Sequence, residues 1–188
     1  MYDSLSNEWT EISRLPLIAS SGTFCGSKFY VCSSDEKLAA YDIERDVWIE
    51  IQTYPPFAPN INAQCHQLVS SNGRLFLMSK LHLLATRTKV KQLWELDLMD
   101  HTWTEISMHH GDELDGKSEV YVADRNLIFG VEMLKGVYDN IFDYFTVCDV
   151  SESNTNVYWK KISWKGVDPK WGAYPSWTRP IAVVHVNI

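Results

Sequence analysis

The chain has 188 residues, a formal net charge of −7 from 17 basic and 24 acidic side chains, and an aromatic content of 13%. This length corresponds to one domain or slightly more, which excludes a large multidomain enzyme, and the negative charge disfavours nucleic acid as a general partner. No apolar run approaches the roughly 20 residues that cross a bilayer, so neither a transmembrane helix nor a membrane partner is expected.

A short hairpin pattern recurs four times along the chain. In each copy an apolar segment ends at an aspartate, a polar turn follows, and a tryptophan opens the return segment. The aspartate is expected to bond the turn backbone, and the tryptophan to cover the hairpin with a large flat surface. The repeated positions are Tyr2, Asp3 and Trp9, then Tyr41, Asp42 and Trp48, then Asp97 and Trp103, and finally Asp149 and Trp159.

Two further strand-like segments precede each complete hairpin, so a full repeat has four antiparallel strands. Full repeats are predicted at residues 22–51, 63–106 and 118–162, after half a repeat at residues 1–12. Residues 163–188 are predicted to form a long aromatic loop and a last strand, Ile181 to Ile188. Four-stranded units that recur every 40 to 55 residues are typical of β-propeller blades.

The predicted fold is therefore an all-β, partial β-propeller with about three and a half blades and a C-terminal strand. A β-sandwich also has short strands, but it gives no reason for the hairpin to recur in phase. Two arrangements of the ends stay open. The blades form either an open arc from a larger ring or a four-bladed ring, in which residues 181–188 join residues 1–12.

One end of the blades is predicted to carry the binding surface. Its loops are long and varied, at residues 52–62, 79–92, 107–117, 134–143 and 163–179. Long loops on a rigid scaffold usually carry recognition, and exposed aromatic side chains are common anchors of protein interfaces. The predicted partner contacts are Tyr54, Phe57, Lys80, Arg87, Lys89, His109, His110, Tyr138, Phe142, Trp171, Tyr174 and Trp177.

Competing interpretations of these loops stay open. The tryptophans of residues 163–179 either contact a partner or fold back and cap the last blade. The basic side chains of residues 79–92 either steer an acidic or phosphorylated partner or belong to a solvated loop. His109 and His110 are adjacent on a predicted loop without a third ligand at metal-site spacing, so no metal is expected there.

The cysteines and the N-terminal sequence predict a reducing compartment. The four cysteines lack CxxC spacing, and three of them lie in apolar, strand-like runs, which favours buried free thiols. The first residues contain no basic region followed by an apolar stretch, so no secretory signal is expected. Together these features predict a cytoplasmic and/or nuclear protein.

The Tyr-Asp-x5-Trp hairpin behind an apolar strand resembles the second half of a kelch motif, and the resemblance extends from Met1 to about Ile162. The chain departs from that motif because it has no Gly-Gly pair. Such degenerate repeats are similar to those of plant F-box/kelch-repeat proteins. The resemblance implies the substrate-recognition part of an SCF-type E3 ubiquitin ligase receptor. It also implies a protein substrate at the long-loop end, and a ligase adaptor as partner only if an F-box lies upstream.

Other functional classes were weighed against this one. Some kelch-like propellers are enzymes or metal proteins, but the chain has no GxSxG, HExxH, phosphate-loop or nucleotide motif. We therefore predict no catalytic residue, no metal and no cofactor, and bound Cu, Fe or Zn in elemental analysis would favour the enzyme class. A kelch scaffold without a link to ubiquitin is the third possibility, which only the sequence upstream of Met1 separates from a receptor.

Overall fold

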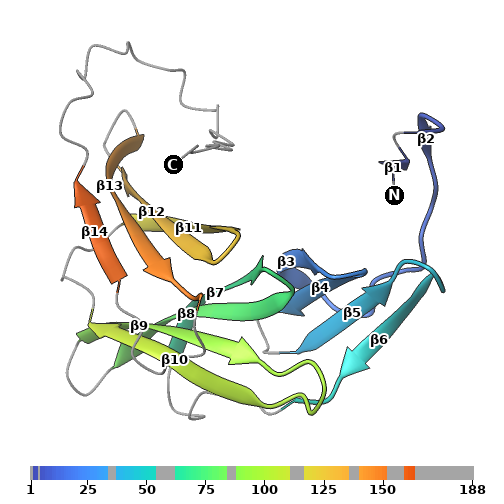
Figure 1. Ribbon diagram of the computed structural model, residues 1–188, viewed down its shortest axis with the longest axis horizontal. Helices are drawn as coiled ribbons and strands as arrows, with labels where there is room; N and C mark the ends of the chain where they lie inside the picture. The colour runs from blue at the N-terminus through green and yellow to red at the C-terminus, as the bar shows by residue number, and fades with distance from the viewer. Residues whose placement is uncertain are drawn as a thin grey trace.

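The computed structural model describes residues 2–3, 5–33, 37–53, 62–83, 88–110, 117–135, 140–151 and 159–163. The elements in these ranges are β-strands, arranged in one two-stranded and three four-stranded sheets. None of the described segments is a helix that is long and apolar enough to cross a membrane. Figure 1 shows the sheets following one another along an arc, with the N-terminal sheet at one end.

The three large sheets confirm the predicted all-β blade architecture. In each sheet the strands are hydrogen-bonded in chain order, and every pairing is antiparallel.

The half-blade consists of β1 (Tyr2–Asp3) and β2 (Glu8–Trp9). Blade 1 is β3 (Ala19–Cys25), β4 (Lys28–Ser33), β5 (Leu38–Asp42) and β6 (Val47–Ile51). Blade 2 is β7 (Asn62–Ser71), β8 (Arg74–Leu83), β9 (Thr88–Leu96) and β10 (Trp103–His110). Blade 3 is β11 (Lys117–Asp124), β12 (Leu127–Lys135), β13 (Asn140–Asp149) and β14 (Trp159–Ser163).

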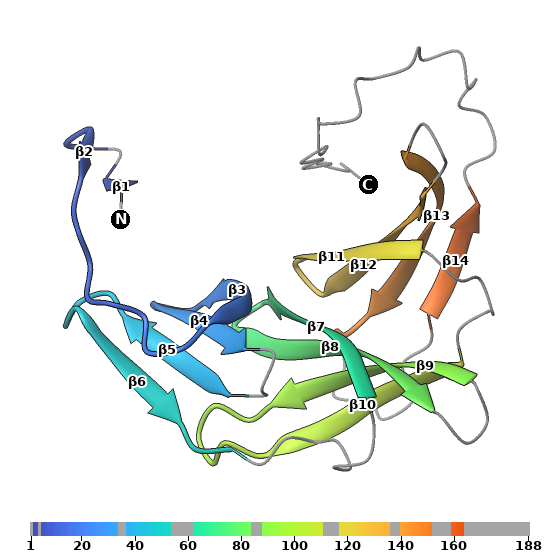
Figure 2. The ribbon, with the colours of Figure 1, turned by 180° about the vertical axis from the view of Figure 1, so that it is seen from behind.

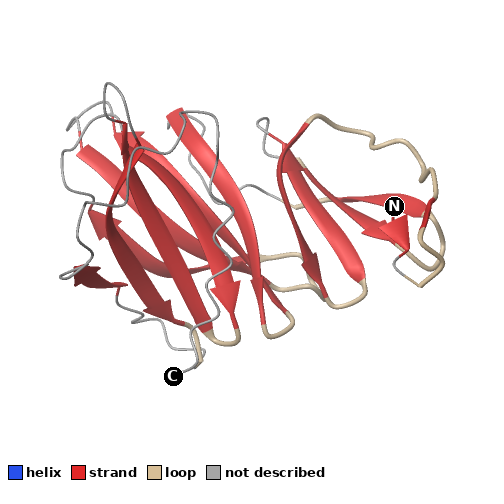
Figure 3. Cartoon of the chain, turned by 90° about the horizontal axis from the view of Figure 1, so that it is seen from above, coloured by secondary structure: helices blue, strands red, loops and turns tan. Residues whose placement is uncertain are grey.

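The first strands of the blades face the concave side of the arc. Figure 2 shows β3, β7 and β11 on this side, and β6, β10 and β14 on the outside. Seen from above, the sheets stand side by side (Figure 3). Two turns of each blade, between its first and second strands and between its third and fourth strands, therefore lie at one end, which we call the turn end. The remaining connections lie at the opposite end, which we call the loop end.

The turns at the turn end repeat in backbone detail. The residue two positions before the hairpin tryptophan has a positive φ in three copies: 58° at Asn7, 51° at Asp46 and 58° at His101. Asn, Asp and His adopt this left-handed conformation more readily than most other side chains. Three of the four hairpin aspartates bond the turn as predicted, because a carboxylate oxygen of each accepts a backbone N–H two or three residues later, while the side chain of Asp3 lies outside the description. These bonds join Asp42 to Arg45 at 3.2 Å, Asp97 to Met99 at 2.7 Å, and Asp149 to Ser151 at 2.9 Å.

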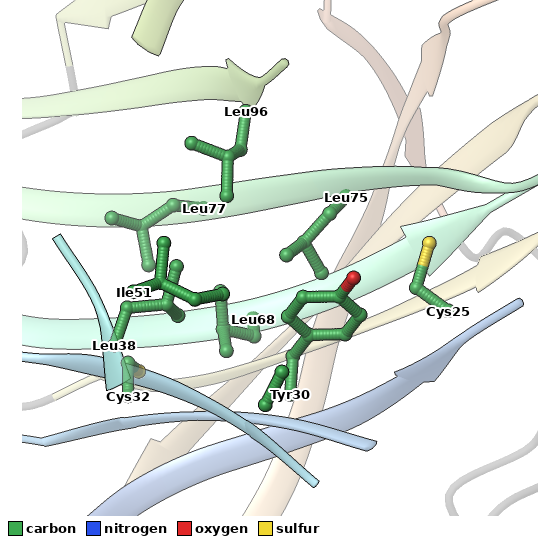
Figure 4. Packing of buried hydrophobic residues seen from close by; sticks show 10 residues of the cluster. Cys25, Tyr30, Cys32, Leu38, Ile51, Leu68, Leu75, Leu77 and Leu96 are labelled. Carbon is green, nitrogen blue, oxygen red and sulfur yellow. The ribbon is translucent and has the colours of Figure 1, made fainter. Parts of the chain in front are cut away.

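The apolar core lies between the blades, in two clusters. The first joins blades 1 and 2 and contains Cys25, Tyr30, Cys32, Leu38, Ala40, Ile51, Leu68, Leu75, Leu77 and Leu96 (Figure 4). The second joins blades 2 and 3 and contains Val69, Phe76, Met78, Leu93, Ile106, Tyr121, Ile128, Cys148 and Val150. Successive side chains of a strand point to opposite faces of its sheet, so the strands of blade 2 supply both clusters. Blade 2 is thus buried on its two faces, whereas blades 1 and 3 each have a face turned away from it.

Polar side chains also join the inner strands. The hydroxyl oxygen of Ser21 in β3 accepts the backbone N–H of Leu68 in β7 at 3.0 Å. The side-chain amide of Gln67 in β7 donates to the carbonyl of Tyr121 in β11 at 2.7 Å and accepts the Tyr121 N–H at 3.0 Å. These bonds satisfy backbone groups at strand edges that no neighbouring strand reaches, which fixes the spacing of the blades.

Candidate functional site

The sequence analysis assigns the predicted partner contacts to the loop end of the blades. Seven of them lie outside the described residues: Tyr54, Phe57, Arg87, Tyr138, Trp171, Tyr174 and Trp177. The other five lie in strands: Lys80 in β8, Lys89 in β9, His109 and His110 in β10, and Phe142 in β13.

The structure corrects the predicted extent of the loops at this end. Residues 79–92 were predicted as one loop, but β8 continues to Leu83 and β9 begins at Thr88. His109 and His110 likewise pair with β9 instead of lying in a loop. The sequence prediction was wrong here because it ended each strand where the apolar run ends. Strand pairing uses backbone N–H and C=O groups, which polar residues supply equally well.

This strand extension brings basic residues of separate segments together. Lys80 lies directly opposite Lys91 in the pairing of β8 with β9, and Lys91 lies opposite His109 in the pairing of β9 with β10. We call Lys80, Lys91 and His109 the basic row. The two lysines at directly opposite positions place positive charge together on one face of blade 2. The row is a local basic site in a chain whose net charge is −7.

The basic row lies at the junction of blades 2 and 3. Along β8, Lys80 follows Phe76 and Met78 at intervals of two residues, and both of those side chains belong to the cluster between these blades. Alternation along the strand therefore assigns Lys80 to the same face, beyond the apolar cluster. The side chains of Lys80 and Lys91 are half-buried, so the junction holds their aliphatic stems.

A buried polar layer backs this end of blade 2. Ser79 and Gln92, opposite each other in the pairing of β8 with β9, are both buried, and so is Ser107 in β10. The Gln92 side-chain amide donates to the carboxylate of Glu105 at 3.4 Å. These buried polar residues lie on the strands that carry the basic row, Ser79 and Gln92 on the face of Leu77 and Ser107 on the face of Leu93. Neither feature was found from sequence, because both depend on the pairing register.

The repeated aromatic residues have structural roles that depend on the neighbouring blade. The Tyr41 and Trp48 rings lie 5.1 Å apart, and those of Tyr121 and Trp159 lie 6.0 Å apart. Trp103 packs against the cluster between blades 1 and 2. Trp9, at the same repeat position, is 80% exposed, and none of the described half-blade residues belongs to either cluster. Trp9 lies opposite Tyr2 in the pairing of β1 with β2, but the side chains of Tyr2 and Asp3 lie outside the description, so cover of this hairpin by Trp9 stays a prediction.

The segment between the half-blade and blade 1 is fastened at the turn end. The Ser13 N–H donates to the Asp46 carboxylate at 3.0 Å, and the Trp48 indole N–H donates to the Ser13 carbonyl at 2.9 Å. The Tyr41 hydroxyl donates to the same carboxylate at 2.5 Å. This bond raises the pKa of Tyr41 to about 12 and lowers the pKa of Asp46 below its ordinary value. A related bond, from the Thr53 hydroxyl to the His101 carbonyl at 2.8 Å, joins blade 1 to blade 2.

Neutralising Asp46 is expected to destabilise the protein at pH 7 but not in strong acid. Because the folded pKa of Asp46 is lowered, its stabilisation is present above the unfolded carboxyl pKa of about 4 and is lost as pH falls through the folded value. The melting temperature of Asp46→Asn should therefore lie below that of the wild type at pH 7, and the difference should shrink as the pH falls below the unfolded carboxyl pKa. Asparagine preserves the left-handed backbone preference. Glu44→Gln, an exposed control in the same turn, should leave the melting temperature unchanged both at pH 7 and in acid. If Asp46→Asn lowered the melting temperature equally at all pH values, the stabilising role of the Asp46 carboxylate would be contradicted.

The described cysteines are buried and form no disulfide. Cys25, Cys32 and Cys148 are free and buried, as predicted, whereas the side chain of Cys65 lies outside the description. Burial raises the pKa of Cys148 to about 12, with a smaller contribution from Asp149, so this thiol is not a nucleophile at neutral pH. Within the described residues, no three His, Cys, Asp or Glu side chains are grouped as a metal site requires.

Comparisons with known proteins agree with this architecture. Residues 1–158 match the sequence profile described as the KIB1-4 β-propeller. Two F-box/kelch-repeat proteins of Arabidopsis thaliana are each 40% identical to the chain over 173 residues, an alignment that covers 87% of this chain and 30% of each relative. The chain thus spans less than a third of the length of these relatives.

Proposed function

Because the chain belongs to the KIB1-4 β-propeller family, we propose that it is a protein-interaction module and, within a longer protein, the substrate-recognition part of an SCF-type ubiquitin ligase receptor. The two Arabidopsis relatives, which are named F-box/kelch-repeat proteins, support this proposal. A ligase adaptor is then a partner of the longer protein, through an F-box outside the residues described here. Propeller blades hold their loop ends rigidly, and recognition surfaces are usually placed on such scaffolds.

The basic row is the observation that supports a specific kind of partner. Lys80, Lys91 and His109 are aligned across three strands, at the end of the blades that the sequence analysis assigns to recognition. A partner with an acidic or phosphorylated segment gains charge-assisted hydrogen bonds from the basic groups of this row. The lysines lie on paired strands, so little backbone entropy is lost when the partner binds.

One capture experiment tests both parts of the proposal. The chain, extended upstream to the next start codon, is used to capture proteins from plant extract as the wild type and as Lys80→Glu/Lys91→Glu. Both forms should recover the ligase adaptor and cullin, whereas the variant should recover at least tenfold less of the proteins bound by the loop end. Arg125→Glu/Lys160→Glu is the matched control, because it changes the net charge equally at two exposed positions away from the row.

The outcomes of this experiment separate the two parts. Recovery of no adaptor by any extended form contradicts the ligase role and leaves an interaction module. Equal losses in the variant and the control contradict the assignment of the basic row. A fall in melting temperature of more than about 5 °C in the Lys80/Lys91 variant would instead assign the row to pairing within the protein.

A reducing compartment, the cytoplasm and/or the nucleus, is part of the same proposal. It is supported by three buried cysteines that remain free thiols.

A further inference from the structure

The face of blade 3 that is turned away from blade 2 is apolar and partly open. Val120 and Val122 in β11 are 43% and 48% exposed. Phe129 in β12 and Val147 in β13 lie beside Val122 in the strand pairing and are half-buried. The four side chains form one continuous patch across three strands, which we call the blade 3 flank.

The equivalent face of blade 2 is closed. Val69 and Val122 lie at the same distance before the first turn of their blades, and Phe76 and Phe129 lie at the same distance after it. Val69 is only 3% exposed and Phe76 is fully buried, because blade 3 packs on them. The exposed fraction is 3% for Val69, which a following blade covers, and 48% for Val122, on the flank. The difference shows how much side-chain surface a following blade buries at this position.

The inner strands indicate which kind of segment the flank accepts. Ser21 and Gln67 occupy the same position, four residues before the end of their strands, and each bonds the backbone of the next inner strand through its side chain. Val120 occupies this position in β11 and has no hydrogen-bonding group. At this position the flank therefore offers an apolar contact in place of a side-chain hydrogen bond, which favours a next inner strand with an apolar packing face.

We propose that residues 181–188 of this chain pack on the blade 3 flank as the inner strand that follows it. Their sequence, Ile-Ala-Val-Val-His-Val-Asn-Ile, alternates so that one face carries Ala182, Val184, Val186 and Ile188. The other face includes His185 and Asn187. This placement continues the contacts of β3 with β7 and of β7 with β11 by one further step.

The length of the connection permits this arrangement. Seventeen residues separate Ser163, the end of β14, from Ile181. An extended chain of this length reaches about 55 Å, whereas crossing the four strands of a blade requires about 15 Å. The inference does not depend on the proposed ubiquitin-ligase role.

Accessibility of a cysteine at Val122 tests the proposal in the full 188-residue chain. Val122→Cys is nearly isosteric, and the parent chain serves as the blank for the four native thiols. If residues 181–188 cover the flank, the new thiol should react with a disulfide reagent at least tenfold more slowly than a small-molecule thiol. Adding Val184→Asp/Val186→Asp should raise this rate at least tenfold, because it places two charges on the packing face. Adding His185→Asp/Asn187→Asp, the matched pair on the opposite face, should leave it within about twofold.

Three results overturn the proposal. The thiol reacts as fast as a small-molecule thiol in the otherwise unchanged chain, so nothing covers the flank. Both aspartate pairs accelerate the reaction equally, so the covering does not depend on the predicted face. The thiol is protected only at high protein concentration and neither pair matters, so a second copy of the chain occupies the flank instead.

Discussion

Replacing Phe76 by alanine is expected to lower the free energy of unfolding by about 3–5 kcal/mol, as is usual for a core phenylalanine. Phe76 lies in the second strand of the central blade, fully buried in the cluster between blades 2 and 3. Both of its neighbouring strands are paired, so the backbone cannot move inward to close the cavity. Guanidinium-induced unfolding, followed by tryptophan fluorescence, measures the effect.

The same substitution at Phe24 is the matched control. The Phe24 side chain is 59% exposed, although its ring lies 4.8 Å from that of Phe29. Phe24→Ala should therefore cost less than about 1 kcal/mol, since little apolar surface returns to water. Similar costs at the two positions would show that the inter-blade cluster is not the main source of stability.

Replacing Arg74 by methionine is expected to cost about 2–3 kcal/mol, the second largest effect. The Arg74 guanidinium makes two hydrogen bonds of 2.6 Å to the carboxylate of Glu95 and a third to the carbonyl of Val150 in blade 3. It also lies 4.9 Å from the centroid of the Phe76 ring. Methionine retains the aliphatic stem, but it leaves Glu95 and the Val150 carbonyl without their donors in a half-buried site. The cost is below that of a fully buried pair because the Arg74 side chain is 22% exposed.

Arg45→Met separates this role from the loss of any arginine. Arg45 contacts Asp42 at 4.0 Å, but its side chain is 78% exposed, and such pairs contribute little. Its replacement should change the free energy of unfolding by less than about 0.5 kcal/mol in the same denaturation assay. A double-mutant cycle with Glu95→Gln should give a coupling energy of at least about 1 kcal/mol with Arg74→Met. A coupling near zero would mean that Arg74 does not tie the blades through Glu95.

The contacts that stabilise the described blades and the proposed recognition site lie at different ends of the blades. The described turns at the turn end bond their own aspartates, and Arg74 and Ser13 fasten neighbouring segments there. The loop end carries the basic row beyond the apolar clusters. Substitutions in the basic row are therefore expected to change partner affinity more than the free energy of unfolding. Substitutions in the apolar clusters are expected to change the free energy of unfolding more than partner affinity.

The repeat by itself determined the blade architecture, because a hairpin pattern is encoded locally. The aspartate, the polar turn and the tryptophan lie within about seven residues, and alternation along a strand is also a local signal. The buried thiols were likewise predictable from their apolar neighbours. The left-handed residues could have been predicted too, because Asn7 and Asp46 have suitable side chains two positions before the tryptophan.

Only the tertiary structure decided features that depend on neighbouring strands and blades. Trp9 and Trp103 occupy the same repeat position, but Trp9 is 80% exposed whereas Trp103 packs against the cluster between blades 1 and 2. The extension of β8 and β9 through polar residues, and with it the basic row, follows from backbone pairing that no local pattern marks. Contacts such as that of Arg74 with the Val150 carbonyl join residues 76 positions apart. Sequence periodicity reports which face of a strand is apolar, but the packing of blades decides whether that face is covered and which polar groups meet beyond it.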